Sequence, residues 1–305
     1  MYSDSDSDFY GDDDLVADLE LRTSKFDTNS WWLRQQAYPT PLRLQAQKQQ
    51  QAKQTTRLHN PYADVPYAWQ LSETVDDFLQ RLPPATTDEI PGNSWIWICN
   101  PYIERKPKNE AQNQNIRGCE DEGPEEEGTN LARFIEGGME RLHFVSQFVD
   151  QFKQSCKSKM VLTRETNKAG NDAAHAILNL AQALRVRCGK WMLFCSVHAV
   201  NEVWGVIAKA TAKNELGIGA KVATRSDVDQ RTERLICVYT ADFGDIEDVK
   251  RVALRLKQLG LVQPRGKSLY YKPDAYTYLG ISSQNPWGVR ASLYNTTDIL
   301  GKAST

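Results

Sequence analysis

The C-terminal part of the sequence alternates short apolar runs with amphipathic helical patterns, and this alternation restricts the possible folds more than any other feature. Nearly uninterrupted apolar runs predict strands at residues 190–196, 220–224 and 235–240. Apolar residues at helical spacing predict helices at residues 201–213 and directly after Asp245. The sequence therefore favours one domain in which helices pack against a sheet.

The helix after Asp245 has clear signals at both ends. Asp245 is a favourable N-cap because its carboxylate can accept a hydrogen bond from a free main-chain N–H, and Gly260 can adopt the left-handed conformation that ends a helix. We expect the apolar face of this helix to share one core with the neighbouring strands and helix. That core is predicted to contain Trp191, Leu193, Val206, Ile236, Val238, Val252 and Leu256.

The remaining sequence adds elements of the same two kinds. Residues 269–281 alternate like a strand, but Pro273 cannot donate to a ladder and so indicates an edge strand or a bend. A helix with Ser72 as its N-cap is predicted at residues 68–82. Other predicted elements are helices at residues 139–152 and 172–186, and a strand at residues 94–103 whose two faces are both largely apolar.

Three stretches lack an apolar period and are predicted to lie outside the core. Residues 1–20 are rich in Asp and Ser and contain no basic residue, and residues 34–57 are rich in Gln. Residues 104–130 hold mainly Glu, Asn, Gln, Lys and Gly. We therefore predict a disordered acidic and Gln-rich tail at residues 1–57, then a single domain at residues 58–305 with a mobile insertion at 104–130.

Composition argues against several classes of protein. No window approaches about 18 uninterrupted apolar residues and the first residues are acidic, so we expect no membrane span and no secretory signal, and a location in the cytoplasm or also in the nucleus. The formal net charge of -2 gives no overall attraction for nucleic acid, so a phosphate-binding surface would have to be a local patch. The 6 cysteines include no CxxC pair, and we expect neither a metal nor a cofactor.

The order of motifs resembles that of a known family. Between residues 188 and 281 the chain carries, in order, CGKWMLF, NEVW, GAKVATR, RLICVYTADFGDIEDVKRVALRLKQLG and SLYYKPDAYTYLGI. These motifs resemble a eukaryotic family first named from basophilic leukaemia cells, whose fold resembles the cap-binding translation initiation factor. The resemblance covers residues 62–82 and 94–295. It implies an α+β fold with a curved antiparallel sheet, helices on the convex face and a ligand slot on the concave face.

The resemblance also implies a ligand site. Arg225 matches the position from which cap-binding factors reach the ligand's phosphates, and a guanidinium fork suits a pair of phosphate oxygens. Lys221 and Arg231 could add positive charge nearby. Trp287 and Arg290 lie in a later loop, where an aromatic ring beside a guanidinium could stack and pair with a nucleotide. Two structural alternatives stay open: an ordinary exposed arginine at a strand end for Arg225, and a wedge under the C-terminal loop for Trp287.

The sequence departs from the cap-binding pattern at several positions. Cap-binding factors hold a methylated base between two Trp rings, because a cationic ring stacks favourably on π-faces. The segment after Ile103 that should carry the first ring has no aromatic residue, and the residues before Cys188, where the second should lie, read LAQALRV. The groove for partner peptides is altered too, with His143 in place of a Trp and with Gly205 and Lys209 near the expected leucines. We expect neither the familiar cap sandwich nor the usual scaffold peptide.

The leading hypothesis is a non-catalytic binding module for a phosphorylated nucleotide or RNA, based on the resemblance, on Arg225, and on Trp287 with Arg290. Two alternatives stay open. One is a protein-interaction module that kept the fold and lost the ligand, with a partner that the sequence does not name. The other is an uncharacterised enzyme. Catalysis has the least support, because no histidine accompanies a nucleophile motif and the polar cluster around Lys272 and Asp274 is typical of a solvated strand face.

Overall fold

The computed structural model describes residues 13–27, 30, 58–91, 93–107, 122–155, 158–226, 233–262 and 266–301. The chain divides into two compact units, residues 1–57 and residues 58–305. In the first unit, helix α1 (Asp13–Ser24) lies within the segment predicted to be disordered, and its described side chains are exposed. Residues 1–12 and 31–57 lie outside the described residues.

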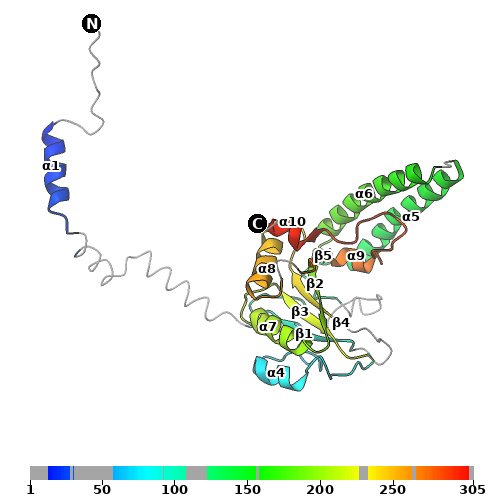
Figure 1. The fold of residues 1–305 in the computed structure, drawn as a ribbon, viewed down its shortest axis with the longest axis horizontal. Coiled ribbons are helices and arrows are strands. Elements are labelled where there is room, and N and C mark those ends of the chain that lie inside the picture. Colours follow the sequence, from blue (N-terminus) through cyan, green and yellow to red (C-terminus); the bar gives the residue numbers. More distant parts are fainter. Residues whose placement is uncertain are drawn as a thin grey trace, which may run out of the picture. The chain divides into compact units, whose positions relative to one another are not determined.

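The second unit contains a six-stranded sheet in the order β1-β3-β4-β2-β5-β6 (Figure 1). Every pair of neighbouring strands is antiparallel, and the sheet is open, with β1 and β6 at its edges. The predicted α+β class with an antiparallel sheet is therefore confirmed. The strands are β1 (Trp95–Cys99), β2 (Gly189–Ser196), β3 (Gly219–Ala223), β4 (Glu233–Thr240), β5 (Tyr270–Pro273) and β6 (Tyr294–Asn295).

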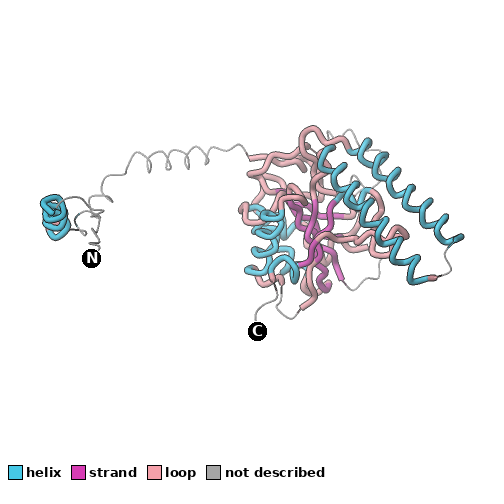
Figure 2. Tube along the Cα trace, turned by 90° about the horizontal axis from the view of Figure 1, so that it is seen from above, coloured by secondary structure: helices cyan, strands magenta, loops and turns pink. Residues whose placement is uncertain are grey.

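Helices flank this sheet, and Figure 2 shows the strands between a group of short helices and a pair of long ones. The long pair is α5 (Leu131–Ser155) and α6 (Lys159–Ala183), which pack against each other. The shorter helices are α4 (Val75–Arg81), α7 (Val200–Ala212), α8 (Ile246–Gln258), α9 (Asp274–Tyr278) and α10 (Thr296–Leu300).

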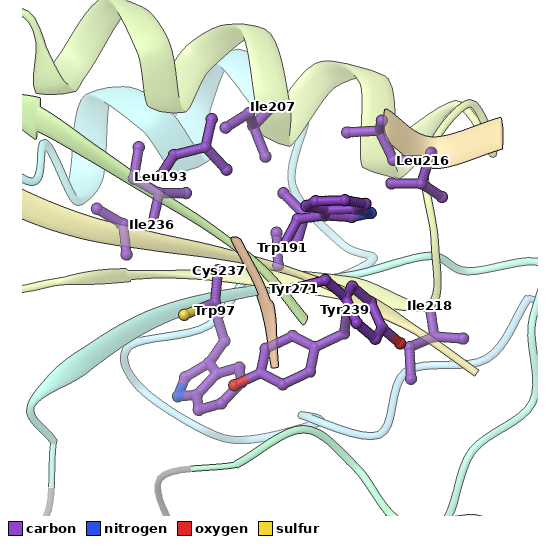
Figure 3. Packing of buried hydrophobic residues seen from close by; sticks show 14 of the residues in the cluster. Trp97, Trp191, Leu193, Ile207, Leu216, Ile218, Ile236, Cys237, Tyr239 and Tyr271 are labelled. Carbon is purple, nitrogen blue, oxygen red and sulfur yellow. The ribbon is translucent and has the colours of Figure 1, made fainter. Parts of the chain in front are cut away.

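The predicted core is present, with one exception. Figure 3 shows Trp191, Leu193 and Ile207 on one side of the strands and Trp97, Cys237 and Tyr239 on the other. The exception is Val206, which is only half-buried, because the next residue of α7, Ile207, is the one that points inward. The other predicted members, Trp191, Leu193, Ile236, Val238, Val252 and Leu256, are all buried in one cluster.

The helix signals near Asp245 are confirmed. Its side chain accepts a hydrogen bond from the main-chain N–H of Asp248, and Gly260 follows the helix with a φ of 79°. The cap of α4 was placed two residues too early, since Thr74 rather than Ser72 accepts the hydrogen bond at its first turn. Both residues are acceptable caps, so the sequence alone does not separate them.

Three predicted elements have clearly different extents in the structure. Helices α5 and α6 are longer than predicted, and the two pack against each other. The extended segment predicted at residues 269–281 is wrong beyond Pro273. There the chain turns into α9, whose N-cap is Pro273 with a φ of -70°, a value that proline favours and that suits the start of a helix.

The segment predicted as a mobile insertion, residues 104–130, is packed at its C-terminal end. Glu122, Gly123 and Pro124 are buried, and helix α5 begins at Leu131. Residues 108–121 lie outside the described residues. The buried residues here include a carboxylate, that of Glu122, and they do not form an apolar period. Hydrophobic periodicity therefore could not predict this packing.

Candidate functional site

Two lysines lie side by side on a buried face of the sheet. Lys190 of β2 is paired with Tyr239 of β4, and Lys221 of β3 is paired with Trp97 of β1. Because successive side chains in a strand point to opposite faces, these residues lie on the face opposite Trp191. We call it the lysine face.

The chain itself supplies an anion to these lysines. The Glu122 carboxylate is buried and contacts the Lys190 ammonium, the Tyr239 hydroxyl at 3.0 Å and the Lys221 ammonium at 3.7 Å. On its other side, the Lys190 ammonium donates to Asp274 Oδ1 at 2.9 Å. Two positive and two negative side chains therefore balance each other under the surface.

Aromatic rings occupy the rest of the lysine face. The Lys221 ammonium lies 3.9 Å from the centroid of the Trp95 ring and 5.2 Å from that of Trp97. At these distances the π-faces stabilise its charge. Tyr62 stacks on Trp97 with a centroid separation of 5.0 Å and is itself buried. The Trp97 ring, which is 6% exposed, is thus already covered by this chain's own side chains.

The pKa values follow from burial and from the neighbouring charges. Burial by itself raises the pKa of Glu122, but the charges of Lys190 and Lys221 outweigh burial and lower it to about 2. Burial raises the pKa of Asp274 to about 6, although Lys190 opposes this change. Burial would lower the pKa of Lys190, but Asp274 and Glu122 raise it above its ordinary value. Lys190 therefore stays charged and is unsuited to act as a general base.

Two of the residues predicted to bind phosphate have partners within the protein. Arg225 Nε donates to Asp88 Oδ1 at 2.5 Å, and both side chains are about half-exposed. Lys221 is 2% exposed and belongs to the buried cluster with Glu122. Arg231 lies outside the described residues.

The predicted loop aromatic has a packing contact. Trp287 Nε1 donates to Ser146 Oγ at 3.0 Å, and the ring packs on Val145 and Val149 of α5. The same loop lies so close to α6 that a Cβ on Gly170 would fall 2.2 Å from the Trp287 carbonyl oxygen. This packing corresponds to the structural alternative for Trp287, in which the ring is a wedge under the C-terminal loop. Arg290 is exposed and lies 3.8 Å from Asp298.

The structure does not bring the predicted site residues together. Arg225 follows β3, whereas Trp287 and Arg290 precede β6 at the far edge of the sheet. Three strands lie between β3 and β6, so about four interstrand spacings of 4.8 Å, roughly 19 Å, separate these two strands. A single mononucleotide phosphate could not contact both sets.

The described residues leave two hollows that bear on function. A cavity of about 20 Å³ beside Asp274 and Cys188 has room for one water molecule. An open groove of about 670 Å³ runs along β2 and includes Phe194 and Tyr270. Burial raises the pKa of the Cys188 thiol to about 12, which makes it a poor nucleophile at neutral pH.

Two further observations concern metal binding and membrane spans. Among the described residues, no three His, Cys, Asp or Glu side chains lie close enough together to hold a metal ion. None of the helices in the described ranges combines the length and apolar character needed to cross a membrane.

Sequence reasoning missed the cluster of Glu122, Lys190 and Asp274. One signal could have found it: Lys190 and Lys221 stand inside strands whose other residues are mostly apolar, and a lysine is rarely buried unless it is paired. That pattern predicts buried acidic partners, although it does not say which acidic residues they are. Glu122 lies 68 residues from Lys190 in a polar segment, so nothing local pointed to it.

Comparison with known families places the chain. Its sequence matches the family described as basophilic leukemia-expressed protein Bles03 over residues 19–280. The match covers most of the 305 residues, including every strand from β1 to β5 and the buried cluster on the lysine face. The chain therefore belongs to the basophilic leukemia-expressed protein Bles03 family.

Proposed function

We propose that residues 58–305 form a non-catalytic protein-interaction module, a variant of the cap-binding initiation factor fold whose ligand face is filled by its own chain. The antiparallel sheet, with α7 and α8 packed on the face that carries Trp191, supports the comparison of folds. The order of motifs from residue 188 to residue 281 supports it as well.

The observation that carries the proposal is the buried position of Glu122 on the lysine face. A nucleotide phosphate seeking Lys190 and Lys221 would have to displace a carboxylate that both lysines already contact. The free energy needed to displace this carboxylate from its buried contacts would reduce the ligand's binding free energy. The base of a nucleotide would also have to displace Tyr62 to reach the Trp97 ring.

The surface residues that were predicted to bind RNA give only weak support for RNA binding. The charge of Arg225 is offset by Asp88, and that of Arg290 lies near Asp298. Trp287 has its indole N–H bonded and its ring packed on α5. Binding of RNA or a nucleotide is therefore the competing outcome that the experiment must detect.

The character of the buried groups supports the non-catalytic part of the proposal. Lys190 is held charged by two carboxylates, and the Cys188 thiol is held protonated by burial. Neither state suits a nucleophile or a base. The four described cysteines are free thiols, which suits a partner met in the reducing cytoplasm or nucleus.

The test compares nucleotide, RNA and protein binding by the full chain. Tryptophan fluorescence is titrated with ATP, GTP and a methylated cap analogue, and anisotropy is measured with a labelled single-stranded RNA at low salt. We expect no saturable response. A photoreactive crosslinker on the purified chain should instead capture protein from a nuclease-treated lysate.

Saturable binding of any nucleotide or RNA that is lost in Lys221→Met would overturn the proposal, since it would show that the lysine face opens to ligands. Lys267→Met is the matched control, because Lys267 is 91% exposed and lies on the β2 groove.

A further inference from the structure

Strand β2 has a free edge over its C-terminal half. It pairs with β4 along its whole length, from Gly189 to Ser196, but with β5 only from Gly189 to Met192. The side of β2 that β5 would cover therefore opens after Met192. This part of the edge borders the groove of about 670 Å³.

The main chain of Phe194 points toward this opening. Cys188 accepts a hydrogen bond from the Asp274 N–H at 2.9 Å, so the main chain of Cys188 faces the β5 side. In an antiparallel ladder, alternate residues direct their N–H and C=O groups to the same neighbour. Counting by twos through Lys190 and Met192 places both groups of Phe194 on the β5 side. Within the described ranges, neither group has a main-chain partner there.

The other wall of the groove is bonded to the segment that begins α10. The main-chain N–H of Thr296 donates to the Leu269 carbonyl at 3.0 Å, and the Leu269 N–H donates to Thr296 Oγ1 at 3.1 Å. The Ser268 hydroxyl lies 2.5 Å from that of Thr297. These contacts tie residues 268–269 to the start of α10, and the ladder between β2 and β5 ends at the pair of Met192 and Tyr270.

The walls of the groove suit an apolar segment. Phe194 is 56% exposed and Tyr270 is 50% exposed, which is unusual for such large rings. Met192, Leu261 and Leu269 add apolar surface to the lining. At the rim, Lys267 and Glu233 lie 3.7 Å apart and offset each other, so the lining residues that the structure describes carry no net charge to attract a phosphate.

We propose that this edge binds an extended, mainly apolar peptide segment of a partner protein, which adds to the sheet beside Phe194 in the place that β5 leaves. The inference rests on the proposed function and specifies its binding surface. The main chain of the segment bonds to the N–H and C=O of Phe194, and one of its large apolar side chains packs between the Phe194 and Tyr270 rings. Strand addition of this kind draws affinity from main-chain hydrogen bonds and selectivity from alternate side chains.

The experiment uses the full chain and a displayed library of random peptides of about eight residues, long enough to span the groove at about 3.3 Å per residue. Peptides enriched on the wild type are synthesised and their affinities measured by anisotropy. Each is also made with single N-methyl groups, which remove one main-chain donor at a time. We expect N-methylation to weaken binding by about tenfold at alternate positions only, because only those amides face β2.

Two variants of the protein complete the test. Phe194→Pro removes the N–H that faces the groove and leaves the bonds to β4 in place, so it should abolish binding. Phe194→Ala keeps that N–H and removes the ring, so it should weaken binding less. If Phe194→Pro fails to fold, the N-methyl series still tests whether main-chain hydrogen bonds at alternate positions hold the peptide.

Three results would overturn the inference: no enrichment over a control protein, binding that N-methylation leaves unchanged at every position, or a dimer of the chain that Phe194→Pro dissociates. The last result would make the occupant a second copy. These outcomes are separate from the failure of the proposed function, which is saturable nucleotide binding that depends on Lys221.

Discussion

Replacing Glu122 with glutamine removes one charge from a buried set of four and keeps nearly the same side-chain shape. The four side chains, Glu122, Asp274, Lys190 and Lys221, are each less than 5% exposed and carry no net charge together. Within this set of four, the variant leaves two positive charges and one negative charge. Lys221 loses its 3.7 Å contact with the Glu122 carboxylate, although the aromatic rings still contact it.

Two independent arguments give the magnitude. A fall of the Glu122 pKa from 4.5 to about 2 corresponds to about 3 kcal/mol of stability, at about 1.4 kcal/mol for each tenfold change in proton affinity. Breaking a buried ion pair by removing one partner costs about 3–5 kcal/mol. We therefore expect Glu122→Gln to lower the free energy of unfolding at pH 7 by about 3 kcal/mol, measured by urea denaturation.

The dependence on pH identifies the cause. The folded pKa of Glu122 lies below its ordinary value, so its contribution is present above pH 4.5 and is lost as the pH falls toward 2. The difference between wild type and variant should shrink over that window. Glu127→Gln, at an exposed carboxylate five residues away, is the matched control and should change stability by less than about 0.5 kcal/mol. A similarly small effect for Glu122→Gln at pH 7 would refute the reasoning.

Other substitutions test neighbouring parts of the account. The folded pKa of Asp274, about 6, exceeds its ordinary 3.8, so its contribution to stability falls as the pH rises between these values, and Asp274→Asn should remove that slope in urea titrations at several pH values. Leu256→Ala should cost about 2–5 kcal/mol by the same assay, because Leu256 is 0% exposed, whereas the exposed Leu254→Ala should cost under about 0.5 kcal/mol. Trp287→Phe should cost about 1 kcal/mol in thermal unfolding through the lost hydrogen bond to Ser146, and no loss would mean that the loop is not docked on α5.

The sheet and the helix after Asp245 could be predicted because their signals are local. An apolar run such as that of β4, or a cap and a glycine at the two ends of α8, lies within one short window of sequence. The end of β5 could not be placed in the same way. Pro273 is compatible with an edge strand and with the start of a helix, and burial of Ala275 and Tyr276 in the core accompanies the helical outcome.

The candidate site was harder to predict because its members are far apart in the chain. Arg225 was found by matching a motif, but its partner Asp88 lies 137 residues earlier and carries no signal of pairing. Glu122 sits among other acidic residues in a polar segment, and its buried contacts with Lys190, Lys221 and Tyr239 distinguish it from them. Which acidic residue is buried depends on the three-dimensional path of the chain, and a single sequence does not encode that path in any local pattern.

The central claim, that the chain fills its own lysine face, is tested most directly by the reactivity of its lysines. Brief treatment of the native protein with an amine-reactive reagent, followed by peptide mass spectrometry, measures how accessible each ammonium is. We expect Lys190 and Lys221, at 4% and 2% exposure, to remain unmodified while Lys267, with a side chain 91% exposed, reacts fully. Modification of Lys221 at a rate close to that of Lys267 would contradict the account, because it would show that the lysine face is open to solvent and available to a ligand.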